Sequence, residues 1–196
     1  MSTIARPERG EATRDALLAA ARALFAERGY AGVGTEEVVR RAGVTRGALY
    51  HHFRDKQDLF RAVFEQTEAE LVQAIGAQVE GIADPMELLH AGVRAFLDAC
   101  GDPVLMRIGL RDAPGVLGWE EWREIGNRHG LGLMTGGLGA AMDGGQIVRT
   151  DVRTLAHLLL SALAEASLLI ASADDPGAAR VEVERTLLAL LDGLRV

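Results

Sequence analysis

Arg46, Tyr50 and His51 lie within six residues, at a spacing that places them on one side of a short helix. A guanidinium, a phenol and an imidazole can donate hydrogen bonds to phosphates and to base edges. A helix of this size fits the major groove of DNA. These residue types and spacings therefore predict DNA binding as the chemistry of this segment.

The predicted DNA-binding surface also includes small or polar neighbours of these three residues: Thr35, Thr45, Gly47, His52 and Lys56. Arg46 is interpreted as a DNA contact, with a solvated charge as the alternative. His52 is expected to pack or cap locally, with a phosphate contact as the alternative. Lys56 opposes the dipole at the start of a helix, which a nearby phosphate would explain. Gly47 would let the backbone approach DNA, or it reflects crowding between helices.

Two short helices around a glycine turn are expected to position this surface. The first is predicted to begin with Thr35 as its N-cap and to end at Gly43, where a left-handed C-cap favours glycine. The second is predicted to begin with Thr45 as its N-cap. Leu49 and Phe53 are four residues apart and would form its buried face. The pattern is typical of a helix-turn-helix.

The run from Glu11 to Phe64 resembles the tetracycline-repressor-like (TetR) family of transcriptional regulators. The resemblance lies in ALFAERGY, AGVTRGALYHHF and the Lys-x-x-Leu-Phe start of the next helix, which occur in this order. It implies a three-helix DNA-binding domain followed by a helical domain for ligand binding and dimerisation. A tyrosine at position 50 is typical of the family. The close resemblance covers roughly the first third of the chain.

The remaining segments carry helical periodicity without strand-type alternation, so the predicted fold class is all-α. The expected organisation is a flexible arm (1–10), a helix-turn-helix domain (11–54) and a helical ligand-binding and dimerisation domain (55–196). A helix from Asp55 to about Ile82 would be about 40 Å long and would join the two domains. Helices over 152–173 and from Val183 are predicted to form a four-helix interface in a homodimer.

The charge distribution reconciles DNA binding with a formal net charge of −7. Residues 1–61 carry 11 Lys and Arg against 8 Asp and Glu, whereas the remainder carries 10 against 20. The basic excess is thus confined to the segment that would meet phosphates. A single cysteine, Cys100, excludes an internal disulfide and fits the cytoplasm. The charged N-terminus lacks the apolar core of a secretory signal.

The segment from Thr154 to Ala173 is long enough to span a bilayer, with Glu165 as its only formal charge. A carboxylate near the centre is costly in lipid, and polar His157 and Ser161 dilute the run. The favoured interpretation is a helix that is buried nearly all round at a dimer interface.

Residues 101–145 hold 12 of the 23 glycines and both tryptophans. Glycine destabilises helices by up to about 1 kcal/mol relative to alanine, so this density indicates close helix approach or mobility. The segment is interpreted as the wall of a ligand pocket, with ordinary core packing as the alternative. The predicted ligand-binding residues are Phe96, Cys100, Met106, Leu110, Trp119, Trp122, His129 and Met134. The acidic second domain favours a neutral or cationic, apolar ligand.

Metal-binding and catalytic motifs are not found in the sequence. His90, His129, His157 and Cys100 lack the short spacing of metal sites, so no metal or cofactor is expected. A paired nucleophile and base is also missing, which disfavours an enzyme with a DNA-docking module. The favoured function is a homodimeric repressor that binds a pseudo-palindromic operator and is released by a small molecule. The alternative is an activator or DNA-binding protein without an inducer.

Overall fold

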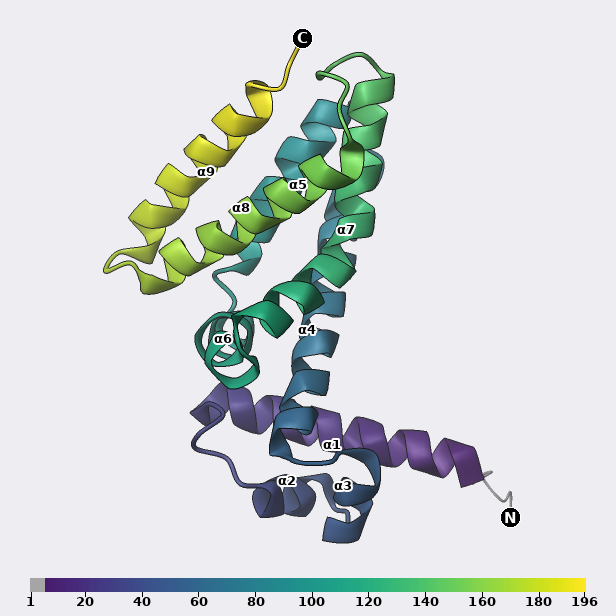
Figure 1. The fold of residues 1–196 in the computed structure, drawn as a ribbon. Helices are drawn as coiled ribbons and strands as arrows, with labels where there is room; N and C mark the ends of the chain where they lie inside the picture. Colours follow the sequence, from purple (N-terminus) through teal and green to yellow (C-terminus); the bar gives the residue numbers. More distant parts are fainter. Residues whose placement is uncertain (1–5) are drawn as a thin grey trace.

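The computed structural model describes the backbone of residues 6–196 and the side chains from residue 10 onward. These residues form an all-helical, elongated molecule with a small head at one end (Figure 1). The elements are α1 (Arg6–Arg28), α2 (Thr35–Ala42), α3 (Arg46–His52), α4 (Lys56–Val79), α5 (Pro85–Ala99), the π-helix η1 (Leu105–Asp112), α6 (Ala113–Leu117), α7 (Trp119–Asp143), α8 (Val152–Ser172) and α9 (Pro176–Asp192).

Helix α1 begins within the predicted flexible arm. It begins at Arg6, so residues 6–10 of that arm are helical, and that part of the prediction was wrong. Residues 1–5 of the predicted arm lie outside the described residues. The helix ends at Arg28, because Gly29 takes a positive φ of 72° that favours glycine.

The helix-turn-helix is formed by α2 and α3. Gly43 adopts the predicted left-handed conformation (φ 67°), and the Thr45 side chain accepts a hydrogen bond from the Ala48 amide at 3.2 Å. The predicted N-cap of α2 was wrong. Gly34 holds that position, and its carbonyl accepts the Glu37 amide, so Thr35 is already the first helical residue.

Helix α4 connects the head to the second domain. Asp55 is its N-cap and accepts the Asp58 amide at 2.8 Å. Its 24 residues give a rod of about 36 Å. The N-terminal half buries Phe60 in the head, whereas Ile75 is buried much further along, within the second domain. Figure 1 shows this helix running from the head into the upper bundle.

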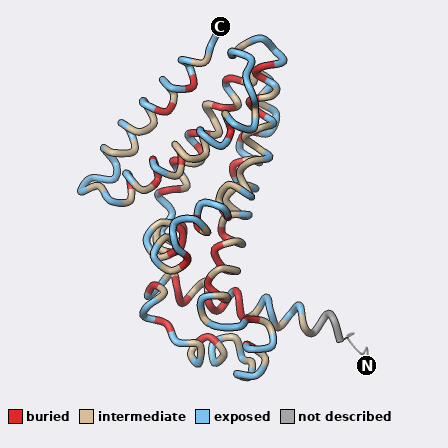
Figure 2. The backbone as a smooth tube through the Cα atoms, in the orientation of Figure 1, coloured by how far each residue is buried: buried red, intermediate tan, exposed pale blue. Residues whose placement is uncertain are grey.

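Two hydrophobic cores are arranged along the molecule, and buried positions occur in both the head and the bundle (Figure 2). The head core contains Phe25 and Phe60 and also receives Ile108 from η1 and Trp122 from α7. The second core is built by α5, α7, α8 and α9 around residues such as Leu138. The head is therefore packed against the second domain and is not attached by α4 alone.

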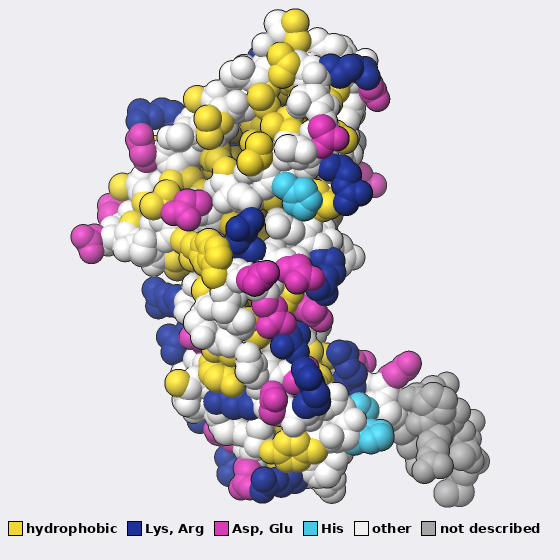
Figure 3. All heavy atoms as spheres, viewed as in Figure 1, with side chains coloured by type: hydrophobic (Ala, Val, Ile, Leu, Met, Phe, Trp, Pro, Cys, Tyr) yellow, Lys and Arg dark blue, Asp and Glu magenta, His cyan; other side chains and the backbone are white. Residues whose placement is uncertain are grey.

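Helices α8 and α9 form an antiparallel pair at the outside of the bundle (Figure 1). Leu158 and Leu169 on α8 are 65% and 52% exposed, and Val181 on α9 is 66% exposed. Hydrophobic side chains gather over this part of the surface (Figure 3). Helix α8 therefore has an open apolar side in the single chain. By length and composition it could cross a membrane, a test that core helices of soluble proteins also pass.

Candidate nucleic-acid interface and ligand chamber

Helix α3 presents a polar face opposite its buried side. Leu49 is completely buried in the head core, whereas Arg46, Gly47, Tyr50 and His51 are exposed. The structure thus brings the predicted DNA-reading residues together on one solvent-facing surface. That they contact DNA remains a prediction.

The side chains on this face are linked to α2. Arg46 Nη1 donates to Glu36 Oε1 at 2.9 Å, and the Arg46 guanidinium carbon lies 5.5 Å from the centroid of the Tyr50 ring. Thr35 hydrogen-bonds the Tyr50 hydroxyl, which, together with Arg46, lowers the pKa of Tyr50. Thr35 therefore belongs to the same surface, although it does not cap α2. Sequence reasoning missed Glu36 as a partner of Arg46.

The structure places the remaining predicted DNA-binding residues beside this surface. The rings of His51 and His52 are 5.2 Å apart, and His52 also approaches the ring of Phe53, in keeping with local packing. Lys56 Nζ lies 4.0 Å from the centroid of the Tyr30 ring, and burial lowers the pKa of Lys56. At Gly47, an added Cβ would meet only the Thr45 hydroxyl at 3.9 Å. Crowding between helices therefore does not explain this glycine.

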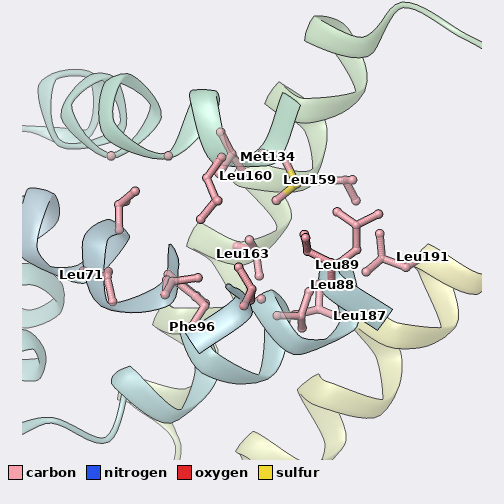
Figure 4. A pocket seen from close by; sticks show the side chains of 18 of the residues that line it. Leu71, Leu88, Leu89, Phe96, Met134, Leu159, Leu160, Leu163, Leu187 and Leu191 are labelled. Atoms are coloured by element: carbon pink, nitrogen blue, oxygen red, sulfur yellow. The ribbon is translucent and has the colours of Figure 1, made fainter. Parts of the chain in front are cut away.

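A hydrophobic chamber lies within the second domain, between α4, α5, α7, α8 and α9. It encloses about 880 Å³ of space, part of it continuous with solvent. Figure 4 shows side chains converging on it from all five helices. They include Leu71, Phe96, Met134, Leu160, Leu163 and Leu187. Its apolar lining fits the usual description of a small-molecule site.

A second cavity of about 580 Å³ adjoins this chamber towards η1. The two share five lining residues: Glu68, Leu71, Phe96, Gly126 and Leu160. Among the predicted ligand-binding residues, Met134 lines the first cavity, Phe96 lines both, and Cys100, Leu110 and Trp122 line the second. Five of the eight predicted pocket residues therefore line these two adjoining cavities.

The other three predicted pocket residues line neither of these two cavities. Leu105 and Leu110 of the π-helix line the second cavity, whereas Met106 of the same helix lines neither. Trp119 is 48% exposed at the start of α7 and lines a shallow surface hollow. His129 precedes the chamber-lining Gly130, so it lies about 100° around α7 from it.

Glu68 is the residue that sequence reasoning missed. It lines both cavities, and within the described residues it makes no hydrogen bond or ion pair. Burial raises the pKa of Glu68 to about 7. A signal was present in the sequence, because Phe64, Glu68, Leu71 and Ile75 follow helical spacing, so a carboxylate interrupts the apolar stripe of α4.

The buried thiol of Cys100 is a poor nucleophile. Burial, with a contribution from Glu68, raises the pKa of Cys100 to about 12, so the thiolate is scarce near neutral pH. No cluster of three or more metal-ligating side chains occurs among residues with described positions.

A polar joint connects η1 to the end of α1 in the head. Asp112 accepts a hydrogen bond from the Tyr30 amide at 2.7 Å. The Arg107 guanidinium lies so close to Gly29 that an added Cβ there would be 2.5 Å from Nη2. Trp122 Nε1 donates to the Gly109 carbonyl at 2.9 Å. The π-helix thus contacts the cavity residue Trp122 through Gly109, and it contacts the head through Asp112.

Comparison with protein families gives matches over both parts of the chain. A model described as "Tetracyclin repressor-like, C-terminal domain" matches residues 86–194, and one described as "Bacterial regulatory proteins, tetR family" matches residues 17–63. A TetR-family transcriptional regulator from Pectobacterium atrosepticum, known from a crystal structure, is 37% identical over 98% of both chains, with a TM-score of 0.87.

Two further similarities are more restricted. The transcriptional activator FasR of Mycolicibacterium smegmatis is 38% identical over 85 residues, which is 43% of this chain and 39% of FasR. The chain thus matches about two fifths of the length of that relative. The crystal structure of RolR in complex with resorcinol has a TM-score of 0.76 at 22% identity, over 94% of this chain and 90% of RolR, which is a likeness of fold.

Proposed function

The chain belongs to the TetR family of transcriptional regulators, and from this membership we propose that it is a homodimeric, cytoplasmic repressor whose operator binding is controlled by a small apolar molecule. The observation that carries the proposal is the apolar chamber, which lies along the same helix, α4, that supports the DNA-binding head. Regulators of this family combine DNA binding with effector binding, and the exposed polar face of α3 and the apolar chamber support one site of each kind.

The open apolar side of α8 and α9 supports dimerisation. Leu158 and Leu169 are 11 residues apart, so they lie on one side of α8, and both are largely exposed in the single chain. An exposed apolar face of this kind marks an interaction surface. A twofold pairing of the α8–α9 hairpins would form a four-helix interface and place two α3 helices for a pseudo-palindromic operator.

The chamber supports a small-molecule effector. It is bounded by five helices and lined mostly by leucine, valine and other apolar side chains, which fit an apolar molecule. RolR, which shares this fold, has been solved with resorcinol. The apolar cavity of the present protein supports the binding of an effector there.

A mechanism for release follows from two connections between the cavities and the head. Helix α4 contributes Phe60 to the head core and Leu71 to the chamber wall. The π-helix contributes Leu105 to the second cavity, and Asp112 to the joint with Tyr30. A ligand that favours one spacing of the two heads would change operator affinity by shifting the population of states.

The experiment that tests this function is a selection of bound duplexes from random DNA by the full-length protein near physiological salt. A Tyr50→Ala variant is the control, because Tyr50 is exposed on α3 and its loss leaves the head core intact. Enrichment of an inverted repeat by the native protein, lost in the variant, is the expected result. A folded protein that enriches no sequence would contradict the proposal.

An activator is the second candidate for the direction of regulation. Over 85 residues, this chain is 38% identical to part of FasR, an activator. Two measurements separate a repressor from an activator. They are the position of the operator relative to a promoter, and transcription in the presence and absence of the protein. Repression in that assay is our expected outcome.

A further inference from the structure

We propose that the effector chamber selects an apolar molecule with a single cationic ammonium group, which pairs with the carboxylate of Glu68. This inference rests on the proposed function and specifies its ligand class.

Glu68 occupies the junction of the two cavities. It is one of five residues that line both, and it lies opposite Gly126 of α7. A Cβ added to Gly126 would be 3.6 Å from Glu68 Oε2, so the carboxylate reaches across to a position that has no side chain to cover it. The group therefore faces the cavity space from the long helix that joins both domains.

The carboxylate has no partner in the described part of the chain that would neutralise it. An unpaired charge in an apolar site is unfavourable, and burial accordingly raises the pKa of Glu68 to about 7. A cationic ligand restores the missing partner and returns the group to its ionised form. A neutral ligand offers no such pairing, and an anionic one would meet a like charge.

The polar groups around Glu68 do not supply a competing cation. Helix α5 contributes the Cys100 thiol, and α8 contributes the hydroxyls of Ser161 and Ser167. Helix α7 contributes Arg123, which is exposed and lies 3.5 Å from the Ser161 hydroxyl at the wall of the second cavity. The first cavity contains no charged lining residue other than Glu68 among those described.

Aromatic rings beside Glu68 complete the site for an ammonium group. Phe96 lines both cavities with Glu68, and Phe64 and Trp122 line the second. The faces of such rings attract cations. The remainder of the chamber, with leucines from α5, α8 and α9, would take the apolar body of the ligand. The combination of one acid with several rings favours an amine over other polar groups.

The test uses three probes with one apolar chain: octyltrimethylammonium, octanol and octanoate. The quaternary ammonium group cannot lose its charge, so any pH dependence belongs to the protein. At pH 8, calorimetric titration of the full-length protein should give at least tenfold tighter binding of octyltrimethylammonium than of octanol, with octanoate weakest. Between pH 8 and pH 6, the affinity for the cation should fall about tenfold, because the ionised fraction of a group with a pKa of about 7 falls by this factor.

Two variants identify the residue. Glu68→Gln should remove the preference for the cation and flatten the pH dependence, while octanol binding persists. Glu70→Gln is the matched control, because Glu70 lies on the same helix and pairs with Arg22 outside the chamber. It should keep both the preference and the pH dependence.

Equal binding of octanol and octyltrimethylammonium by the native protein, or no binding of the cation, would overturn the inference. A cation preference that survives in Glu68→Gln would also overturn it. Operator binding by the same preparation reports on the proposed function separately. If octanol or octanoate releases the operator and the protein shows no preference for the cation, the result supports ligand-controlled regulation and contradicts the proposed role of Glu68.

Discussion

Arg46 Nη1 donates a hydrogen bond to Glu36 Oε1 over 2.9 Å, so the guanidinium at the start of α3 forms an ion pair with a carboxylate of α2. Both side chains are mostly exposed, and such a surface pair contributes at most about 1 kcal/mol to stability. The pair therefore orients Arg46 rather than holding the head together. It can open at little cost when a phosphate or a base edge competes for the guanidinium.

Substitutions at this pair should act in opposite directions on DNA binding. Arg46→Ala should lower discrimination between operator variants by about 1–3 kcal/mol if Arg46 pairs with a base. Glu36→Gln should tighten binding to all DNA, because it removes a negative charge near the phosphates. Fluorescence anisotropy titrations with operator and scrambled duplexes over a range of salt concentrations would measure both effects. A Glu36→Gln variant that loses preference at one base pair would instead identify Glu36 as a base reader.

The joint between η1 and the head should carry part of the ligand response. Asp112→Ala removes the acceptor of the Tyr30 amide, which we expect to lower the free energy of unfolding by about 1–3 kcal/mol. Ligand and operator should each still bind, but saturating octyltrimethylammonium should change operator affinity less than it does in the native protein. Asp143→Ala is the control, since its ion pair with Arg149 is exposed at the other end of α7. If octyltrimethylammonium changes operator affinity as much in Asp112→Ala as in the native protein, the ligand response is transmitted to the head by α4 alone.

Dimerisation is best tested on the exposed side of α8. Leu163 looks suitable from sequence, but it is buried and lines the chamber, so its replacement would disturb the protomer itself. Leu169 is 52% exposed, and Leu169→Arg should give a monomer with a folded head and greatly weakened operator binding. Sedimentation velocity and anisotropy would report the two effects. Val148→Arg, at an exposed position before α8, should remain dimeric. A monomeric Leu169→Arg that binds the operator normally would contradict the interface.

The helix-turn-helix could be predicted because its signals are local. Gly43 and Thr45 end one helix and begin the next within three residues, and Leu49 and Phe53 specify the buried face by their spacing. The wrong N-cap prediction at Thr35 has the same local origin. Thr35 and the preceding Gly34 both fit an N-cap in sequence, and in the structure Gly34 holds that position. Short-range capping and periodicity determine this part of the fold.

The ligand chamber was less predictable because its members are brought together by tertiary packing. In sequence, Glu68 only interrupts the apolar stripe of α4, and its place at a cavity depends on Gly126, 58 residues later, which lies opposite it. Met106 was predicted from its apolar side chain in the glycine-rich segment, but it lines neither cavity, whereas Leu105 and Leu110 of the same π-helix line the second. Neither the packing partner nor the helix type has a signal in single-sequence periodicity.

The pH dependence of stability should reveal the unpaired carboxylate of Glu68. Its pKa is 4.5 ordinarily and about 7 in the folded protein. Between these values the unfolded chain has already lost the proton that the folded chain retains, so this group lowers the free energy of unfolding as pH rises from about 4.5 to about 7. Above about pH 7, the raised pKa of Glu68 lowers the free energy of unfolding by roughly 3 kcal/mol. Urea unfolding at pH 5 and pH 8 should show Glu68→Gln gaining stability relative to the native protein only at the higher pH. An equal difference at both values would contradict the burial of an ionisable group.

Gly92 offers a way to fill the chamber without disturbing its walls. It lines the chamber from within α5, and an added Cβ would meet no atom within 4 Å. Gly92→Leu should therefore project into the cavity, and it should stabilise the helix by up to about 1 kcal/mol from the loss of glycine alone. If the cavity is a ligand site, binding of octyltrimethylammonium should be abolished while the unliganded protein still binds its operator. The operator would then no longer be released by the ligand. Thermal unfolding, calorimetry and anisotropy on one preparation would measure the three properties, and retained ligand binding in a stabilised Gly92→Leu protein would locate the effector site outside this chamber.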